Sequence, residues 1–186
     1  MHQVWIGLGS NLGEREAYLA AGAKSISSLG NAKFASVYET APQFPRGIDA
    51  PGGPFLNTVC RLETDCNVFE VFVALGKIES RNLRTRSFPF SPRTLDLDLL
   101  GYDQLCMRRG IPPAQVSGGS AAAPLFSSLS IPHPRMHRRR FVLVPLAELD
   151  PSWQHPLLRR NSRELLQGLE DPSSVKWHCA SSDLSI

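Results

Sequence analysis

Two carboxylates separated by one leucine are the residues of this sequence whose spacing most directly suggests chemistry. Asp96 and Asp98 lie in a stretch that alternates leucine with acidic residues, which is typical of a strand. Because side chains of a strand alternate between its faces, both carboxylates should point the same way, about 7 Å apart. Such a pair suits Mg²⁺, which binds one or two carboxylates and completes its shell with phosphate oxygens and water. In isolation, the same pattern would more often be a solvated strand face.

Arginines directly upstream change the interpretation of this pair. Arg84, Arg86 and Arg93 lie in a proline-containing segment that leads into the predicted strand. Guanidinium groups bind phosphate bidentately and stabilise charge on a phosphoryl group in transfer. Arginines beside a metal site therefore predict phosphoryl transfer, although a solvated basic loop would have the same composition.

A second basic cluster, residues 131–141, contains two histidines and four arginines after a Pro-His-Pro turn. It could complete a triphosphate pocket. A basic run with an aromatic residue is equally compatible with an RNA-binding patch.

Phe55 and Asn57 should share one face of another predicted strand. A ring and an amide in this arrangement could stack on a flat substrate and bind its edge, although core packing also explains such a phenylalanine. The turn that contains Gly7, Gly9, Ser10 and Asn11 lacks the spacing of a dinucleotide-binding turn and the Gly-Lys-Ser/Thr of a P-loop. We expect its glycines to allow tight packing under the site.

The elements that must position these residues follow from periodicity and from glycine and proline punctuation. Strands are expected at about 4–8, 33–40, 55–64, 94–102 and 140–146, and helices at 14–29, 68–79 and 163–169. This order favours an α+β fold in which helices cover a mostly antiparallel sheet.

Bulk composition bounds the remaining possibilities. With 186 residues, 42% of them hydrophobic, and a formal net charge of +3, the sequence suits one domain spanning 1–186. Residues 108–128 are predicted to form a flexible insertion, and the C-terminus a polar tail. No signal peptide or membrane span is apparent, so a cytoplasmic protein without a membrane partner is expected. The four scattered cysteines indicate neither a disulfide framework nor a zinc site.

Six motifs, in this order, resemble the 6-hydroxymethyl-7,8-dihydropterin pyrophosphokinase family. The resemblance covers roughly residues 4–151, and its most specific string is Pro-Arg-Thr-Leu-Asp-Leu-Asp. The motifs are Gly9-Ser10-Asn11-Leu12, Tyr38-Glu39-Thr40, Phe55-Leu56-Asn57, Ile78-Glu79, Pro92-Arg93-Thr94-Leu95-Asp96-Leu97-Asp98 and Ile131-Pro132-His133-Pro134.

The resemblance implies a ferredoxin-like fold, with helices on both faces of the sheet, and an enzyme of folate biosynthesis. The enzyme would transfer pyrophosphate from ATP to the 6-hydroxymethyl group of the dihydropterin and release AMP. Asp96 and Asp98 would bind two Mg²⁺ ions and, with Arg84 and Arg93, form the catalytic set. Residues implied around the pterin are Thr40, Pro42, Phe55, Asn57 and Phe141, and those around ATP are Glu79, Arg84, Arg86, Arg93, Ser130, His133 and Arg139.

Three departures from the family pattern set the alternatives. Pro89-Phe90-Ser91-Pro92-Arg93 stands where the family has Arg-Trp-Gly-Pro-Arg, and Gly76 and Leu83 replace a glutamine and a glycine. A relative that binds pterin and nucleotide with weakened catalysis is one alternative. An RNA-binding ferredoxin-like module is the other, although two carboxylates on its binding face would repel phosphate, and no nucleic-acid partner is expected. The oligomeric state is left open.

Overall fold

The computed structural model describes residues 1–42, 52–82, 92–107, 129–184 and 186. Six strands, four α-helices and two short 3-10 helices lie in these ranges. The strands are β1 (His2–Ser10), β2 (Asn31–Phe34), β3 (Val37–Thr40), β4 (Phe55–Thr64), β5 (Asp96–Tyr102) and β6 (Val175–Cys179). The helices are α1 (Arg15–Ser27), α2 (Val68–Arg81), η1 (Met136–Arg138), α4 (Arg140–Leu149), α5 (Ser162–Gln167) and η2 (Ser181–Leu184).

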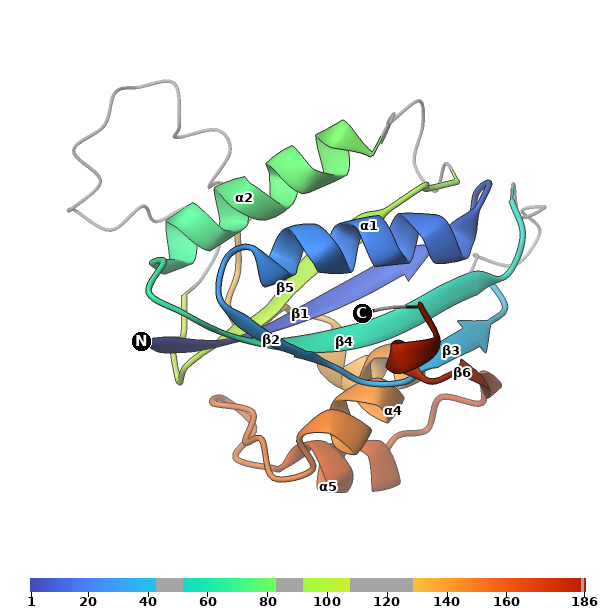
Figure 1. Cartoon of the computed structure of the whole chain (residues 1–186). Coiled ribbons are helices and arrows are strands. Elements are labelled where there is room, and N and C mark those ends of the chain that lie inside the picture. The colour runs from blue at the N-terminus through green and yellow to red at the C-terminus, as the bar shows by residue number, and fades with distance from the viewer. Residues whose placement is uncertain (43–51, 83–91, 108–128, 185) are drawn as a thin grey trace.

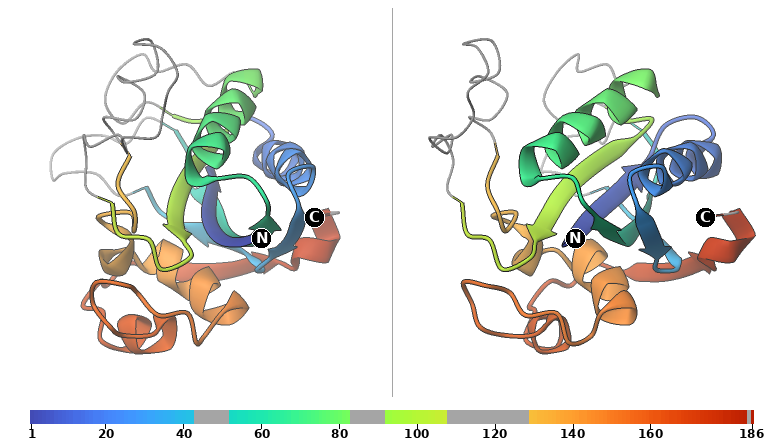
Figure 2. Two further views of the ribbon diagram at one scale, coloured as in Figure 1. Left: turned by 90° about the vertical axis from the view of Figure 1, so that its left-hand side faces the viewer. Right: turned by 60° about the vertical axis from the view of Figure 1, so that its left-hand side comes forward.

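The strands form one sheet in the order β5-β1-β4-β3-β6, with β2 paired to β4 beside this path. Every strand pairing recorded between them is antiparallel. Helices α1 and α2 cover one face and α4 and α5 the other, as Figures 1 and 2 show. The predicted ferredoxin-like α+β fold, with helices on both faces of the sheet, is therefore confirmed.

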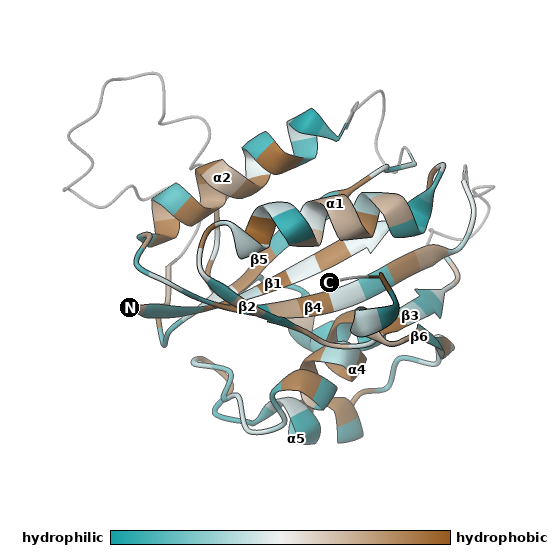
Figure 3. Cartoon of the chain, in the orientation of Figure 1, coloured by the Kyte–Doolittle hydropathy of each residue, from teal (hydrophilic) through white to brown (hydrophobic). Residues whose placement is uncertain are grey.

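Alternating side chains of the sheet feed two separate cores. Val4, Ile6 and Leu8 point to the core under α1 and α2, whereas Trp5 and Leu100 point to the core under α4 and α5. Figure 3 shows hydrophobic residues along the sheet and on the helices that cover it. Burial on both faces explains why the strands contain long apolar runs.

Residues 140–146 form the first part of helix α4, so the strand predicted there is wrong. The β-branched valines around Pro145 suggested a strand, yet the buried residues Val142, Leu143 and Leu146 recur at helical spacing. Burial of this stripe against the sheet outweighs the local preference and the backbone hydrogen bond that Pro145 cannot donate.

The strand predicted at 33–40 is divided in two, since Ala35 and Ser36 separate β2 from β3. The break has a partner on α4, because the Ser36 N–H and hydroxyl both donate to the Glu148 carboxylate, at 3.0 and 2.8 Å. The C-terminal stretch, described from the sequence only as a polar tail, contributes strand β6 and pairs with β3. None of its five residues is fully buried, so no apolar pattern predicted it.

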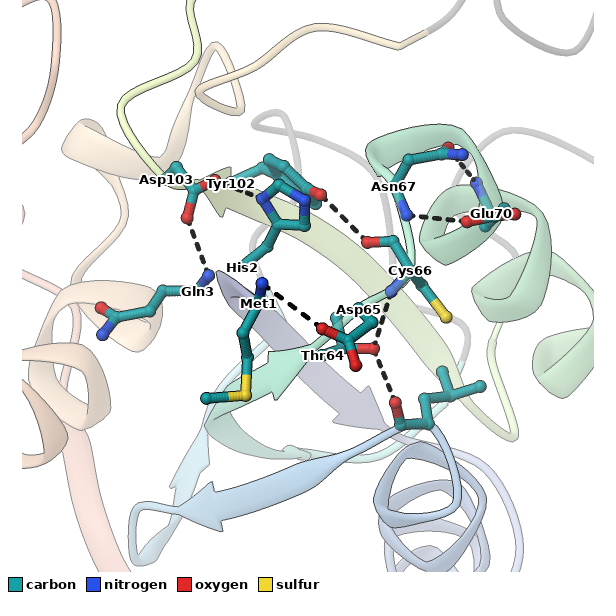
Figure 4. A network of polar contacts seen from close by, with 11 residues as sticks. Met1, His2, Gln3, Thr64, Asp65, Cys66, Asn67, Glu70, Tyr102 and Asp103 are labelled. Carbon is teal, nitrogen blue, oxygen red and sulfur yellow. Dashed lines mark hydrogen bonds and ion pairs between the residues drawn. The ribbon is translucent and has the colours of Figure 1, made fainter.

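A polar network joins the start of β1 to the end of β5 (Figure 4). The His2 ring lies 2.7 Å from an Asp103 carboxylate oxygen, and the Gln3 N–H donates to the other oxygen at 2.8 Å. The Tyr102 hydroxyl donates to the Cys66 carbonyl, which precedes α2. Polar side chains at this end of the strand pair therefore satisfy one another.

Helix α2 begins with a capping box in which Asn67 and Glu70 bind each other's backbone N–H groups, as Figure 4 also shows. In the described part of the chain, no helix has both the length and the apolar content needed to cross a membrane.

Candidate active site

The candidate site residues lie along one row that crosses four neighbouring strands of the sheet, β5, β1, β4 and β3. Strand pairing sets Asp96 opposite Gly9, Gly9 opposite Asn57, and Asn57 opposite Tyr38. Asp98 lies opposite Gly7, one step further along β5. Because directly opposed residues of paired strands share a face, these side chains gather on the α4 side of the sheet.

The two glycines of β1, Gly7 and Gly9, have neighbouring side chains close to the positions that a Cβ would occupy. A Cβ at Gly9 would lie 3.3 Å from the Asn57 side-chain oxygen, and one at Gly7 would meet the Leu100 side chain at 3.5 Å. The Asn57 and Leu100 side chains therefore lie directly against these glycines. This agrees with the expectation that the glycines allow tight packing under the site.

Arginines from two distant segments reach the carboxylates. The Arg93 guanidinium is hydrogen-bonded to Asp96, and an Arg139 nitrogen lies 3.5 Å from an Asp98 oxygen. The structure thus brings the proline-arginine string and the second basic cluster together at one point. Arg84 and Arg86 lie outside the described residues.

Burial and neighbouring charges shift the pKa values of Arg139 and His133. Burial lowers the Arg139 pKa, and Arg135 and Arg93 lower it further, whereas Asp98 and Asp96 raise it. Burial, reinforced by Arg139 and Arg135, also lowers the His133 pKa to about 4, so this imidazole is neutral at pH 7. Its Nδ1 accepts the Arg135 N–H at 3.3 Å, which places the proton on Nε2. His133 can therefore donate one hydrogen bond without adding a positive charge.

The residues implied around a flat substrate occupy the neighbouring positions. Thr40 and Asn57 are buried, and the Asn57 amide donates to the Thr40 hydroxyl at 2.9 Å. Phe55 pairs with Thr40 across the strands, and Pro42 follows β3 directly. Phe141 lies in the first turn of α4, and the Arg139 guanidinium lies 5.4 Å from its ring centroid.

Glu79 and Ser130 are placed differently from the other implied nucleotide contacts. The Glu79 carboxylate, which is almost buried, accepts the Leu97 N–H at 2.7 Å on the α2 side of β5. It therefore fixes the backbone between the two aspartates. Ser130 is half-buried next to Ile131, which bridges Met107.

Asn11 holds the backbone of Arg93 in place, a contact that the sequence did not predict. Its backbone N–H donates to the Arg93 carbonyl at 3.0 Å, and its side-chain oxygen accepts the Arg93 N–H at 2.8 Å. Asn11 is buried, so these two bonds are shielded from water. It lies in the glycine-rich turn, but nothing in the sequence pairs it with a residue 82 positions away.

Asp96 and Asp98 are suited to a hard cation that is shared with phosphate oxygens. Both carboxylates are partly exposed on one face of β5. Over the described ranges, no group of three or more His, Cys, Asp or Glu side chains could hold a metal ion. Mg²⁺ usually binds one or two protein carboxylates and completes its coordination with phosphate oxygens and water.

Comparison with known families decides among the interpretations. The sequence pattern of the 7,8-dihydro-6-hydroxymethylpterin-pyrophosphokinase (HPPK) family matches residues 5–151. The chain belongs to the HPPK family. A Bacillus subtilis relative named 2-amino-4-hydroxy-6-hydroxymethyldihydropteridine pyrophosphokinase is 36% identical over 148 residues, which cover 78% of this chain and 76% of the relative. A Haemophilus influenzae relative with the same name is 33% identical over 152 residues, which cover 80% of this chain and 82% of the relative.

Solved structures of HPPK proteins share the fold. A Plasmodium falciparum HPPK-DHPS structure superposes with a TM-score of 0.65 and 14% sequence identity, and the match covers 89% of this chain. The chain spans 44% of that longer protein.

Proposed function

We propose that this HPPK-family chain transfers the pyrophosphoryl group of ATP to the 6-hydroxymethyl oxygen of 6-hydroxymethyl-7,8-dihydropterin. The new bond joins that oxygen to the β-phosphorus of ATP, and the bond from the β-phosphorus to the α–β bridging oxygen breaks. AMP leaves with the bridging oxygen, and the hydroxyl proton passes to solvent. The observation that carries the proposal is the convergence of Arg93 and Arg139 on Asp96 and Asp98 in an HPPK-family fold.

The described arginines hold and neutralise the triphosphate. Arg93 contacts Asp96 and Arg139 contacts Asp98, so together they would hold the phosphates in place. Their charges also stabilise the negative charge that develops on AMP as it leaves. Neutral His133 adds an Nε2–H donor to a phosphate oxygen or to the base. Arg84, Arg86 and Ser130 complete the proposed nucleotide set, with Glu79 acting through the β5 backbone.

Asp96 and Asp98 would hold Mg²⁺, with two ions expected when ATP is bound. The ions supply charge neutralisation and orientation of the phosphate chain. The residues of the chain keep the two carboxylates at a fixed separation, because β5 is paired to β1 and tied to Glu79.

The dihydropterin is proposed to lie over the row of Asn57 and Thr40, with Phe55 and Phe141 as aromatic contacts and Pro42 at its edge. Since the Asn57 amide nitrogen already donates to Thr40, its oxygen remains the acceptor for a pterin N–H. The hydroxymethyl group is proposed to point along this row toward Asp96 and the phosphates.

The test is product analysis of the purified chain incubated with ATP, Mg²⁺ and hydroxymethyl-dihydropterin. AMP and the dihydropterin diphosphate are expected in equal amounts. Binding of both substrates by the folded protein without AMP would reject the reaction and favour the weakened relative. Salt-sensitive RNA binding that needs no ATP would favour the RNA-binding module.

A further inference from the structure

A cavity of about 700 Å³ lies on the α4 and α5 side of the molecule, and its lining contains none of the proposed site residues. It is bounded by η1, the turn at 158–160, α5 and residues 168–171. Its volume falls in the range of small-molecule sites, roughly 300–1,000 Å³. Arg138 lines the cavity, whereas the next residue, Arg139, reaches Asp98. Arg138 therefore lies at the cavity, and Arg139 lies at the candidate active site.

One wall of the cavity is built around the Arg160 guanidinium. Its Nη2 donates to the Glu164 carbonyl in the last turn of α5 at 2.6 Å. A Cβ at Gly168 would lie only 2.7 Å from the same nitrogen, although the Gly168 backbone has an ordinary φ of −88°. A side chain at this position would therefore displace the guanidinium, which is the end of a flexible and exposed side chain. Arginine has five N–H donors, so further donors remain for a ligand.

Two acidic residues, Glu170 and Asp171, also line the cavity. Both Asp171 oxygens accept backbone N–H groups, from Arg140 at 3.0 Å and from Ser173 at 2.9 Å. Glu170 is exposed, as are Arg138 and Arg160, so water weakens all three charges without removing them. Leu165, which is buried, and Leu169 provide apolar surface between the charged groups.

We propose that this cavity binds a small organic anion, in which a phosphate or carboxylate contacts Arg138 and Arg160 and an apolar body packs on Leu165 and Leu169. Guanidinium groups recognise both anions in the same bidentate way. The apolar body distinguishes the ligand from free phosphate, since it removes leucine surface from water. The proposal is independent of the proposed reaction.

The test is a titration of the full chain with phenyl phosphate and with phenylacetate, followed by NMR of the leucine methyl groups. At least one should bind with a dissociation constant below about 1 mM, and at least about tenfold more tightly than inorganic phosphate or phenol. Shifts should centre on Leu165 and Leu169. The stronger of the two ligands identifies the preferred anion.

Variants of charged residues in and beside the cavity test whether the anion binds there. Arg160→Met should weaken binding about tenfold through loss of the charge-assisted contact, whereas Arg163→Met, on an exposed residue of α5, should not. Glu170→Gln should tighten binding by about threefold, because it removes a nearby negative charge. Equal affinity for inorganic phosphate, or an unchanged affinity in Arg160→Met, would overturn the proposal.

Discussion

The two ends of the β1–β5 strand pair use polar residues in opposite ways. At the His2 end, side chains and backbone groups bind one another, and Asp103 accepts both a ring nitrogen and a backbone N–H. At the Gly9 end, β1 carries no side chain opposite Asp96, and the carboxylates face arginines on an open part of the sheet. The same ladder therefore supports a structural network at one end and a reactive cluster at the other.

The largest effect should come from Asp98→Ala. This change removes a proposed Mg²⁺ ligand and the partner of Arg139, so turnover should fall by at least about a thousandfold. Steady-state AMP formation measures the loss, and circular dichroism checks the fold. Asp103→Ala, at the other end of the strand pair, is the matched control and should retain full turnover. Similar losses in both variants would erase the distinction between the two ends.

Filling the floor of the site at Gly9 should impair pterin binding. Gly9→Val places methyl groups beside the Asn57 oxygen, where even a Cβ would lie at 3.3 Å. The KM for the dihydropterin should rise at least about tenfold, because overpacking displaces the Asn57 amide. Gly7→Ala is the control, since its Cβ would make ordinary contact with Leu100. A KM unchanged by Gly9→Val would place the pterin elsewhere.

Asn11→Ala should act on the chemical step through Arg93. Loss of the side-chain acceptor leaves the partly buried Arg93 N–H without its partner, at a cost near the lower end of about 1–3 kcal/mol. If part of this cost appears as misplacement of the guanidinium, kcat should fall about tenfold while the KM for the pterin changes little. Asn31→Ala, which removes an exposed amide bonded to Glu63, controls for loss of an asparagine. A larger effect on the pterin KM than on kcat would contradict this role.

Acid should destabilise the α4 and α5 side of the molecule through its buried imidazoles. Burial lowers the His155 pKa to about 4, and its Nδ1 accepts N–H groups from Leu157 and Leu158. Between the ordinary histidine pKa of about 6.5 and pH 4, the unfolded chain binds more protons than the folded chain. The free energy of unfolding should thus be steady above pH 6.5 and fall as the pH drops toward 4.

Each such histidine contributes a slope of up to about 1.4 kcal/mol per pH unit, and His133 adds a contribution of the same sign. Urea unfolding across this range measures the slope. His155→Gln should lower this slope by the contribution of one histidine. An unaltered slope would contradict the lowered pKa of His155.

The smallest effect should come from breaking the network at the His2 end. Asp103→Ala should lower the free energy of unfolding by no more than about 1 kcal/mol, because the pair is solvent-exposed. Chemical denaturation measures this change. A loss of several kcal/mol would show that the network contributes far more to stability than an exposed ion pair.

Local patterns predicted the parts of the structure that depend on neighbouring residues. Strand β4 matches its predicted bounds, and the period of two placed Asp96 and Asp98 on one face of β5. Helix α4 was not predicted because its valines favour a strand, and only burial against the sheet selects the helix. Strand β6 was not predicted because its stability comes from pairing with β3 and not from an apolar pattern.

Long-range contacts account for what the sequence did not predict in the candidate site. The contact of Arg139 with Asp98 was not predicted as such, since 41 positions separate them; the sequence suggested only that the 131–141 cluster could complete a triphosphate pocket. Two further contacts depend on how separate elements pack together. They are the hydrogen bonds of Asn11 to Arg93 and of Glu79 to Leu97. The periodicity of hydrophobic residues along the chain does not predict such long-range contacts.

The most direct measurement is ³¹P NMR of the complete reaction, run in parallel on the unaltered chain, Asp98→Asn and Asp103→Asn. The unaltered chain and Asp103→Asn should convert ATP to AMP with a new diphosphate ester, and Asp98→Asn should leave ATP intact. Formation of ADP in place of AMP, or full turnover by folded Asp98→Asn, would contradict the assignment of pyrophosphoryl transfer to the Gly9 end of the strand pair.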